Sequence, residues 1–332
     1  MNTSDKDTIK LPTTPLSQPQ RRAKSIWSSQ LHRREALDGY IFILPWFLGL
    51  LFFVMGPFIA GLYYSLTEYD GLTPPRWLGL QNYRNVLFDD SKFWLAVYNT
   101  AWYVGASVLP GVILGLLLAL LLNQKVRGIT VFRTLFYLPS IVPAVASVAL
   151  FIYILHDRFG LLNETLFQVF NVIGPNWLTS PTWSKPSLVI WSLWGIGSGM
   201  IIYLAGLQGV PEVLYEAAAL DGAGAFRRFW RITLPMISPT IFFVLILGII
   251  GSFQIFTPVF LLGGTNYGQA AAGPMDSLLF WVVYIYNQGF FYFRMGYASA
   301  LAWLLFIILM ILTFIQFRLA KRWVYYEDEV AR

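Results

Sequence analysis

Residues Pro211–Pro235, PEVLYEAAALDGAGAFRRFWRITLP, form a polar, helix-prone stretch between two long apolar runs. Its first residue suits the first turn of a helix, and Glu212 favours the positive end of the helix dipole. Asp221-Gly222 is expected to end this helix, because glycine tolerates the left-handed backbone that a helix C-terminus often needs. Residues 223–233 are expected to restart a helix, which the closing proline limits. The stretch therefore predicts two short helices separated by a glycine.

The two halves of this stretch differ in charge. The first half carries acidic residues, whereas a helix that rests on anionic lipid headgroups normally presents Lys and Arg. The acidic residues are Glu212, Glu216 and Asp221. Arg227, Arg228 and Arg231 in the second half do suit headgroups. A helix on the membrane surface is therefore the alternative interpretation, but a short, acidic-rimmed helix of small residues favours docking into a groove on another protein.

The spacing of the small and acidic residues is similar to that of a known motif. Glu216-Ala217-Ala218, Gly222, Ile232 and Leu234-Pro235 fall at the positions of the EAA loop in permease subunits of binding-protein-dependent ABC importers. The resemblance implies that the stretch is a cytoplasmic coupling helix that docks in a cleft of the ATP-hydrolysing subunit. The residues that it assigns to this contact are Glu216, Ala217, Ala218, Asp221, Gly222, Leu234 and Pro235.

Composition points to a membrane protein. Of the 332 residues, 57% are hydrophobic and only 12% are charged, about half the charged fraction of a soluble domain. The net charge of +6 comes from basic residues clustered at the ends of apolar runs, which indicates membrane topology and argues against a nucleic-acid partner. With no cysteine and two histidines, the sequence predicts no metal site, and no cofactor is expected.

The expected fold is an all-α membrane protein with six transmembrane helices. Runs of about 20 residues or more, enough to cross a bilayer, lie near residues 40–65, 95–122, 134–155, 187–207, 236–262 and 296–317. Residues 277–293 have a short uncharged core and are expected to form an interfacial or re-entrant helix instead.

Basic residues predict the orientation of these spans. The first, third, fifth and last segments outside the membrane hold 17 of the 23 Lys and Arg residues. The positive-inside rule therefore puts both termini, and the loop between the fourth and fifth spans, in the cytoplasm. Three regions are expected: a disordered basic cytoplasmic tail over residues 1–39, a transmembrane domain over residues 40–320, and a cytoplasmic tail over residues 321–332. The expected location is a bacterial plasma (inner) membrane.

Glycines and prolines within the spans predict close packing and kinks. Gly111 and Gly115 make a Gly-x-x-x-Gly pair, and residues 195–199 of the fourth span are rich in glycine. Close helix packing explains these glycines at least as well as a place in a solute pathway. Pro139 and Pro143 are expected to kink the third span.

Polar and aromatic residues mark a candidate solute pathway. Ser252 and Gln254 lie in the fifth span, and Trp191 and Trp194 lie in the fourth. Amides and hydroxyls read sugar hydroxyl groups, and aromatic faces stack on sugar rings. The alternative is ordinary structural chemistry, because Trp is common near membrane interfaces and Ser can bond its own helix backbone.

The wider chain, residues 40–320, is similar to the carbohydrate-uptake branch of these permeases, the relatives of the maltose and glycerol-3-phosphate importers. The resemblance rests on FYLP at residues 136–139, the EAA loop, and SFQIF at residues 252–256. It implies the type I ABC importer permease fold and a sugar site halfway across the membrane. The residues that it maps to this site are Trp191, Trp194, Gly195, Gly248, Ser252 and Gln254. Gly248 and Ser252 stand where the maltose relative carries serine and asparagine, so the sugar stays unnamed.

The function expected is therefore a transmembrane subunit of an ATP-driven sugar importer that performs no covalent chemistry. The implied partners are a second, homologous permease, a dimer of ATP-binding subunits, an extracytoplasmic solute-binding protein and the lipid bilayer. The chain lacks a Gly-x-x-x-x-Gly-Lys-Ser/Thr phosphate loop, so ATP hydrolysis is expected on a separate chain. A permease for glycerol-3-phosphate or another small polar solute is an alternative.

Two other classes of protein remain as alternatives. The six predicted spans contain no Asp, Glu, Lys, Arg or His, which argues against an ion-driven secondary transporter because such proteins usually bury an ionisable group in the membrane. A membrane scaffold or channel, with the loop serving only to anchor a soluble partner, is the second alternative.

Overall fold

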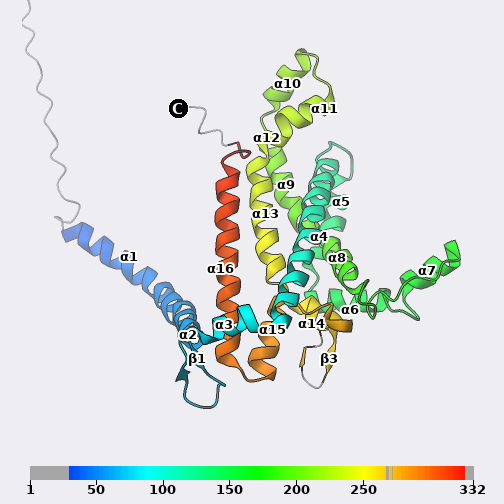
Figure 1. Ribbon diagram of the computed structural model, residues 1–332. Coiled ribbons are helices and arrows are strands. Elements are labelled where there is room, and N and C mark those ends of the chain that lie inside the picture. Colours follow the sequence, from blue (N-terminus) through cyan, green and yellow to red (C-terminus); the bar gives the residue numbers. More distant parts are fainter. Residues whose placement is uncertain (1–29, 267–268, 271, 326–332) are drawn as a thin grey trace, which may run out of the picture. The chain divides into compact units, whose positions relative to one another are not determined.

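The computed structural model describes residues 30–266, 269–270 and 272–325 (Figure 1). The chain divides into two units, residues 1–58 and residues 59–332. The first unit contains α1 (Gln30–Gly49), the π-helical turn η2 (Leu50–Met55) and the start of α2 (Gly56–Ser65). Residues 30–39, expected within a disordered tail, are helical, since LHRREAL continues the helix with good helix formers. The rest of that tail, residues 1–29, lies outside the described residues.

Three helical stretches are long and apolar enough to cross a membrane without a break. They are Arg34–Ser65, α4 (Ser91–Leu122) and α16 (Met295–Ala320). The start of α4 is fixed by Asp90, whose carboxylate accepts a hydrogen bond from the backbone N–H of Phe93 at 3.1 Å. These stretches correspond to the first, second and sixth predicted spans. The first and second begin several residues before their predicted starts, and the sixth begins close to its predicted start.

Three further spans are bent pairs of helices. The helices α5 (Ile129–Ile141) and α6 (Ala144–Ile154) meet at 95°, and α8 (Ser184–Trp194) and α9 (Gly197–Gln208) meet at 45°. The third pair, Ala225–Met236 and α13 (Ser238–Phe253), meets at 63°; of this pair only α13 lies in the predicted fifth span, because residues 225–235 belong to the polar stretch. Counting each pair as one span gives the six that the sequence predicts. Val142 is extended, with Pro143 after it, which explains the sharp bend of the third span.

The predicted fifth span, residues 236–262, is wrong at its C-terminal end. The helix α13 ends at Phe253, and a separate short helix, α14 (Thr257–Gly263), follows after a break. Pro258 lies in the first turn of α14. Its missing N–H and its ring oppose continuation of α13 through this point, so the chain starts a new helix.

Short elements connect these helices. An antiparallel hairpin follows α2, formed by two short strands, β1 (Thr67–Glu68) and β2 (Arg76–Trp77). The remaining elements are α3 (Gln81–Arg84), η3 (Asn85–Asp89), α7 (Leu161–Phe170), α10 (Glu212–Leu220), α11 (Ala225–Arg228), η4 (Phe229–Thr233), α12 (Leu234–Met236), β3 (Thr265–Asn266), β4 (Gln269–Ala270), η5 (Pro274–Asp276), α15 (Trp281–Tyr286) and η6 (Asn287–Phe291).

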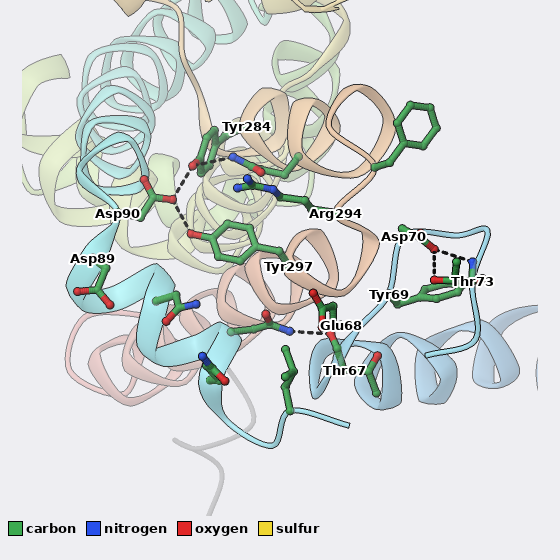
Figure 2. Close-up of a pocket in the computed structure, with 16 residues that line it drawn as sticks. Thr67, Glu68, Tyr69, Asp70, Thr73, Asp89, Asp90, Tyr284, Arg294 and Tyr297 are labelled. Atoms are coloured by element: carbon green, nitrogen blue, oxygen red, sulfur yellow. Dashed lines mark hydrogen bonds between the residues drawn. The ribbon is translucent and has the colours of Figure 1, made fainter. Parts of the chain in front are cut away.

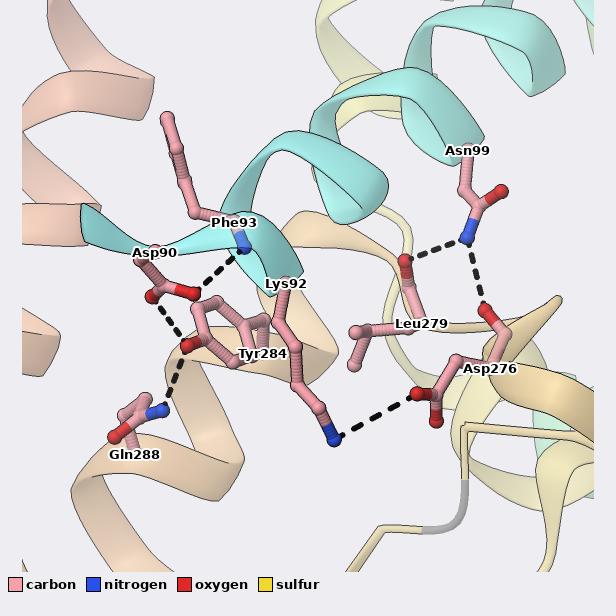
Figure 3. Close-up of polar contacts among 8 residues, drawn as sticks. All are labelled: Asp90, Lys92, Phe93, Asn99, Asp276, Leu279, Tyr284 and Gln288. Atoms are coloured by element: carbon pink, nitrogen blue, oxygen red, sulfur yellow. Dashed lines mark hydrogen bonds and ion pairs between the residues drawn. The ribbon is translucent and has the colours of Figure 1, made fainter. Parts of the chain in front are cut away.

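Residues 277–293, expected to form an interfacial or re-entrant helix, contain α15. Residues 278–281 lie in the protein core, whereas Phe290, Tyr292 and Phe293 are exposed. Trp281 is fully buried, and its ring meets that of Phe93 edge to face, with centroids 5.1 Å apart. The backbone N–H of Trp281 donates to the Thr100 hydroxyl at 3.0 Å. Figure 3 shows Asn99 of α4 donating to the carbonyl oxygens of Asp276 and Leu279, at 3.0 and 3.1 Å. This burial is not that of a surface-lying helix.

Close helix packing explains some of the glycines for which the sequence predicts it. A Cβ on Gly115 of α4 would lie 3.3 Å from the ring of Tyr203 on α9, whereas a Cβ on Gly111 would meet no atom within 4 Å. A Cβ on Gly197, at the start of α9, would overlap the carbonyl oxygen of Phe136 on α5. Of these positions, Gly197 is therefore the one that the packing of the spans requires to be glycine.

Replacing this glycine gives a direct test of the packing. Gly197→Ala should lower stability by about 1–3 kcal/mol, the usual range for overpacking a well-packed site, and lower the melting temperature of the purified protein in detergent. Gly111→Ala is the matched control, and should melt at the same temperature or slightly higher because alanine favours helix over glycine. Equal melting temperatures for the two variants would show that α5 and α9 do not pack this closely.

Candidate functional site

The polar stretch at residues 211–236 folds as the sequence predicts, as two helices separated by a glycine. Pro211 caps α10, which ends at Leu220, and Gly222 takes the left-handed backbone with φ of +73°. The second helix begins at α11 and continues through η4 and α12. We call residues 211–236 the coupling loop, after the role that the resemblance implies for them, and Figure 1 shows α10 and α11 beyond the ends of α13 and α16.

The expectation that Pro235 limits the second helix is wrong by one residue, since the helix continues to Met236. The turn before this proline is a π-helix in which the N–H of Leu234 donates to the carbonyl of Phe229. The wider turn moves the carbonyls away from their α-helical positions, so the proline ring fits without ending the helix.

A hydrogen bond ties the two halves of the coupling loop together. The Tyr215 hydroxyl of α10 lies 2.9 Å from the hydroxyl of Thr233, which is buried. Tyr215 and Ile232 also pack against the buried cluster formed by α4, α9 and the start of α13. An exposed ion pair, Lys125 to Glu212 at 3.1 Å, adds little because both groups remain in solvent. The base of the loop is therefore fixed to the spans.

The tip of the coupling loop is exposed and partly apolar. Leu220 is 91% exposed and Phe226 is 78% exposed. Of the seven residues that the resemblance assigns to coupling, four lie exposed at this tip: Glu216, Ala217, Asp221 and Gly222. The other three, Ala218, Leu234 and Pro235, are half-buried nearer the base. The arrangement can bind a partner surface, with an acidic carboxylate among small side chains.

The three arginines of the loop gather on one side of it. Together with Ala218 and Asp221 they line a hollow of about 290 Å³. The residues are Arg227, Arg228 and Arg231. Within the described part of the chain, none of these arginines forms an ion pair with an acidic side chain.

All six residues predicted for the solute pathway line one or both of two neighbouring cavities. The first has a volume of about 460 Å³ and is bordered by Trp191, Gly248, Ser252 and Gln254. The second, of about 450 Å³, is bordered by Trp191, Trp194 and Gly195. Trp191 lines both cavities, so the structure brings residues of the fourth and fifth spans together around one indole.

The polar groups of the two cavities differ in what they already bind. The Trp191 indole N–H donates to the Ser147 hydroxyl at 3.2 Å, which fixes its ring. Ser140 donates to a carbonyl of its own helix and Ser198 to the carbonyl of Gly195, just before α9, so both bond nearby backbone as the structural alternative predicts for serines. Among the described residues, no partner occupies the hydroxyl of Ser252 or the amide of Gln254. These two side chains therefore remain available to a solute.

The cavity linings are uncharged. Neither lining includes Asp, Glu, Lys, Arg or His. Sequence reasoning missed Tyr103, which borders the first cavity from α4, and Pro139, which borders the second. Pro139 carried a kink signal in the sequence, whereas nothing in the local pattern around Tyr103 sets it apart from other aromatic residues of the spans.

Comparison with known proteins identifies the family. The family described as "Binding-protein-dependent transport system inner membrane component" matches residues 111–325. The chain belongs to this family. The permease is 38% identical to the probable ABC transporter permease protein YesP of Bacillus subtilis, over 92% of the chain and 98% of that relative. It is 33% identical to the lactose transport system permease protein LacF of Rhizobium radiobacter, over 88% and 97% of the two chains.

A solved relative has the same fold. The permease matches a chain of a bacterial ABC transporter "involved in the import of the acidic polysaccharide alginate" with a TM-score of 0.75 and 26% identity, over 87% of this chain and 96% of that chain. A second structure of a bacterial alginate ABC transporter, in complex with an alginate pentasaccharide-bound periplasmic protein, matches with the same TM-score. The predicted type I importer permease fold is confirmed, and the permease is an inner-membrane transport component and not an enzyme.

Proposed function

We propose that the permease is the transmembrane subunit of an ATP-driven sugar importer and forms half of the translocation pathway. The observation that carries the proposal is the structure of the coupling loop. Its base is held by the Tyr215–Thr233 hydrogen bond, and its exposed tip presents Glu216 beside small and apolar side chains. The helices of this loop are too short to bury their own apolar side chains, so the tip suits a groove on a partner protein. The proposed partner is a separate ATP-hydrolysing subunit, present as a dimer.

The proposed orientation puts the coupling loop and both termini in the cytoplasm. The distribution of Lys and Arg supports this. The C-terminal end of α16 and the coupling loop also lie at the same end of the spans, because the backbone N–H of Tyr325 donates to the Ser238 hydroxyl at 2.9 Å. Residues 326–332 of the proposed C-terminal tail lie outside the described residues.

The solute proposed is a neutral sugar that crosses beside Trp191. Relatives are named for the transport of lactose and of trehalose or maltose, and the free side chains of Ser252 and Gln254 can bond hydroxyl groups. The absence of charged residues from both cavity linings favours a neutral solute over glycerol-3-phosphate, whose phosphate needs a cation or a set of N–H donors.

A complete pathway needs further chains in this proposal. A second, homologous permease would supply the other wall of the pathway, and an extracytoplasmic solute-binding protein would deliver the sugar. ATP binding would close the ATPase dimer, and the coupling loop would transmit that movement to the spans, opening the pathway toward the binding protein.

Purification of the tagged permease from mild detergent tests this assembly. Identification of every copurifying chain should find an ATP-binding subunit and a second permease. Addition of a sugar-loaded binding protein to this complex should raise its rate of ATP hydrolysis. A permease that purifies alone, folded and stable, would instead support the ion-driven secondary transporter, and copurification without stimulated hydrolysis would support a scaffold.

A further inference from the structure

A cavity of about 920 Å³, larger than either of the two around Trp191, lies apart from the proposed sugar pathway, and Figure 2 shows the residues that line it. It is bordered by the β1–β2 hairpin, by α3 and η3, and by the segment that leads into α16. We call it the hairpin cavity. It shares no lining residue with the two cavities around Trp191.

The hairpin cavity and the coupling loop lie at opposite ends of the spans. Arg294 and Tyr297, which border the cavity, are at the first turn of α16. The other end of α16 leads to Tyr325, which bonds Ser238 beside the coupling loop. In Figure 1, α15 and β1 lie at one end of α16 and α10 lies toward the other. If the coupling loop is cytoplasmic, as proposed above, the hairpin cavity opens on the outer face.

The cavity lining is strongly acidic. It contains four carboxylates, from Glu68, Asp70, Asp89 and Asp90, against one guanidinium, from Arg294. Glu68 and Asp89 are exposed and form no ion pair within the described part of the chain. Backbone N–H donors from Thr73 and Leu72 lower the pKa of Asp70, so this carboxyl is ionised. The rim therefore presents uncompensated negative charge.

The floor of the cavity contains a hydrogen-bond acceptor without a donor. Asp90 accepts hydrogen bonds from the hydroxyls of Tyr284 and Tyr297 (Figure 2). The Gln288 amide N–H donates to the Tyr284 hydroxyl at 2.9 Å (Figure 3). This network fixes the orientation of the Gln288 amide. Its Oε1 atom has no hydrogen-bond partner, although the residue is only 6% exposed and borders the cavity. A buried acceptor in this state calls for a donor.

We infer that the hairpin cavity receives a lysine or arginine side chain of the solute-binding protein that docks on the permease. The inference rests on the proposed function. A cationic side chain matches the acidic rim, because its charge balances the carboxylates and its N–H groups can donate to them. One solved relative is a transporter in complex with a periplasmic protein, so a protein partner on the outer face has a place in such assemblies.

Other occupants fit the cavity less well. In the described part of the chain, no three acidic or histidine side chains lie close enough together to hold a metal ion. Asp90 already accepts three hydrogen bonds, so it has little capacity left for a ligand. A protein side chain can instead meet the dispersed carboxylates of Glu68 and Asp89 one at a time.

A zero-length carbodiimide crosslink tests the contact directly. The reagent joins a carboxylate to a lysine amine only when the two are in ion-pair contact. The permease complex, in nanodiscs, is mixed with the binding protein that stimulates its ATP hydrolysis, crosslinked, digested and examined by mass spectrometry. We expect a linkage from Glu68 or Asp89 to a lysine of the binding protein, and its loss from the Glu68→Gln/Asp89→Asn variant.

Affinity measurements cover the case in which the partner residue is arginine. At low salt, Asp89→Lys should weaken the binding protein's affinity at least tenfold, and raised salt should shrink the difference because ion pairs are screened. Glu164→Lys is the matched control: Glu164 is an exposed acidic residue of α7 outside the cavity, and its reversal changes net charge equally. Both variants should copurify with the ATP-binding subunit as the wild type does, which shows that the complex remains assembled.

Two results would overturn the inference. One is the absence of any crosslink together with an affinity in Asp89→Lys equal to that of the control. The other is a wild-type affinity that falls on addition of EDTA and does not fall in Asp89→Lys, which would assign the cavity to a divalent cation. Failure of the proposed function is distinguishable from both, because the wild-type complex would then not bind the binding protein at all.

Discussion

Glu216→Lys should reduce solute uptake to background while leaving the permease folded in the membrane. The residue is exposed at the tip of the coupling loop, and its side chain forms no hydrogen bond or ion pair among the described residues, so we expect the substitution to leave the fold intact. In the docked state, however, it places a reversed charge in a protein interface, where losing one partner of a charge pair costs about 2–5 kcal/mol. Uptake of labelled sugar into cells, with membrane levels measured by immunoblot, gives both quantities.

The same defect should follow from Gly222→Asp. The glycine has φ of +73°, a backbone conformation that strains most other residues, and the new carboxylate adds charge at the tip. Glu164→Lys on α7 is the control with the same charge change as Glu216→Lys, and should take up solute normally. Normal uptake in both loop variants, at equal membrane levels, would refute docking through this loop.

Ser252→Trp should block uptake without loss of ATPase binding. Ser252 is half-buried in the wall of the 460 Å³ cavity, and its hydroxyl has no partner among the described residues. An indole at this position fills space that the proposed sugar needs, beside Trp191. We expect uptake to fall at least tenfold, while the purified complex keeps its ATP-binding subunit and its basal ATP hydrolysis.

The control for this variant lies on the same helix. Phe243 of α13 is 51% exposed and borders neither cavity, so Phe243→Trp adds bulk outside the proposed pathway. It should transport as the wild type does. If Ser252→Trp also transports normally, the cavity beside Trp191 is not the pathway, and the residues around it serve helix packing alone.

Local chemistry explains why the coupling loop was predictable. A proline followed by glutamate, an alanine-rich run and a glycine specify a helix start and a helix end within a few residues, and Gly222 takes the predicted left-handed backbone. The apolar runs similarly specify the spans, because a helix satisfies its backbone groups within a single segment that crosses lipid. The kink at Val142-Pro143 follows from proline geometry alone.

Tertiary contacts explain what the sequence did not reveal. The break after Phe253 separates α13 from α14, and hydropathy does not register it because both sides are apolar. The hairpin cavity depends on contacts of Asp90 with Tyr284 and Tyr297, which are 194 and 207 positions away in the sequence. No periodicity connects such residues. The unpaired acceptor of Gln288 likewise results from the tertiary arrangement of its neighbours, which the sequence pattern does not specify.

Solute uptake into proteoliposomes tests the central claim most directly, that ATP hydrolysis on a partner drives import through this permease. The purified complex is reconstituted with ATP sealed inside, and sugar-loaded binding protein is added outside, with and without an uncoupler that collapses ion gradients. The account predicts uptake that requires internal ATP and external binding protein and persists with the uncoupler. Uptake that proceeds without ATP and stops when the ion gradient collapses would contradict it.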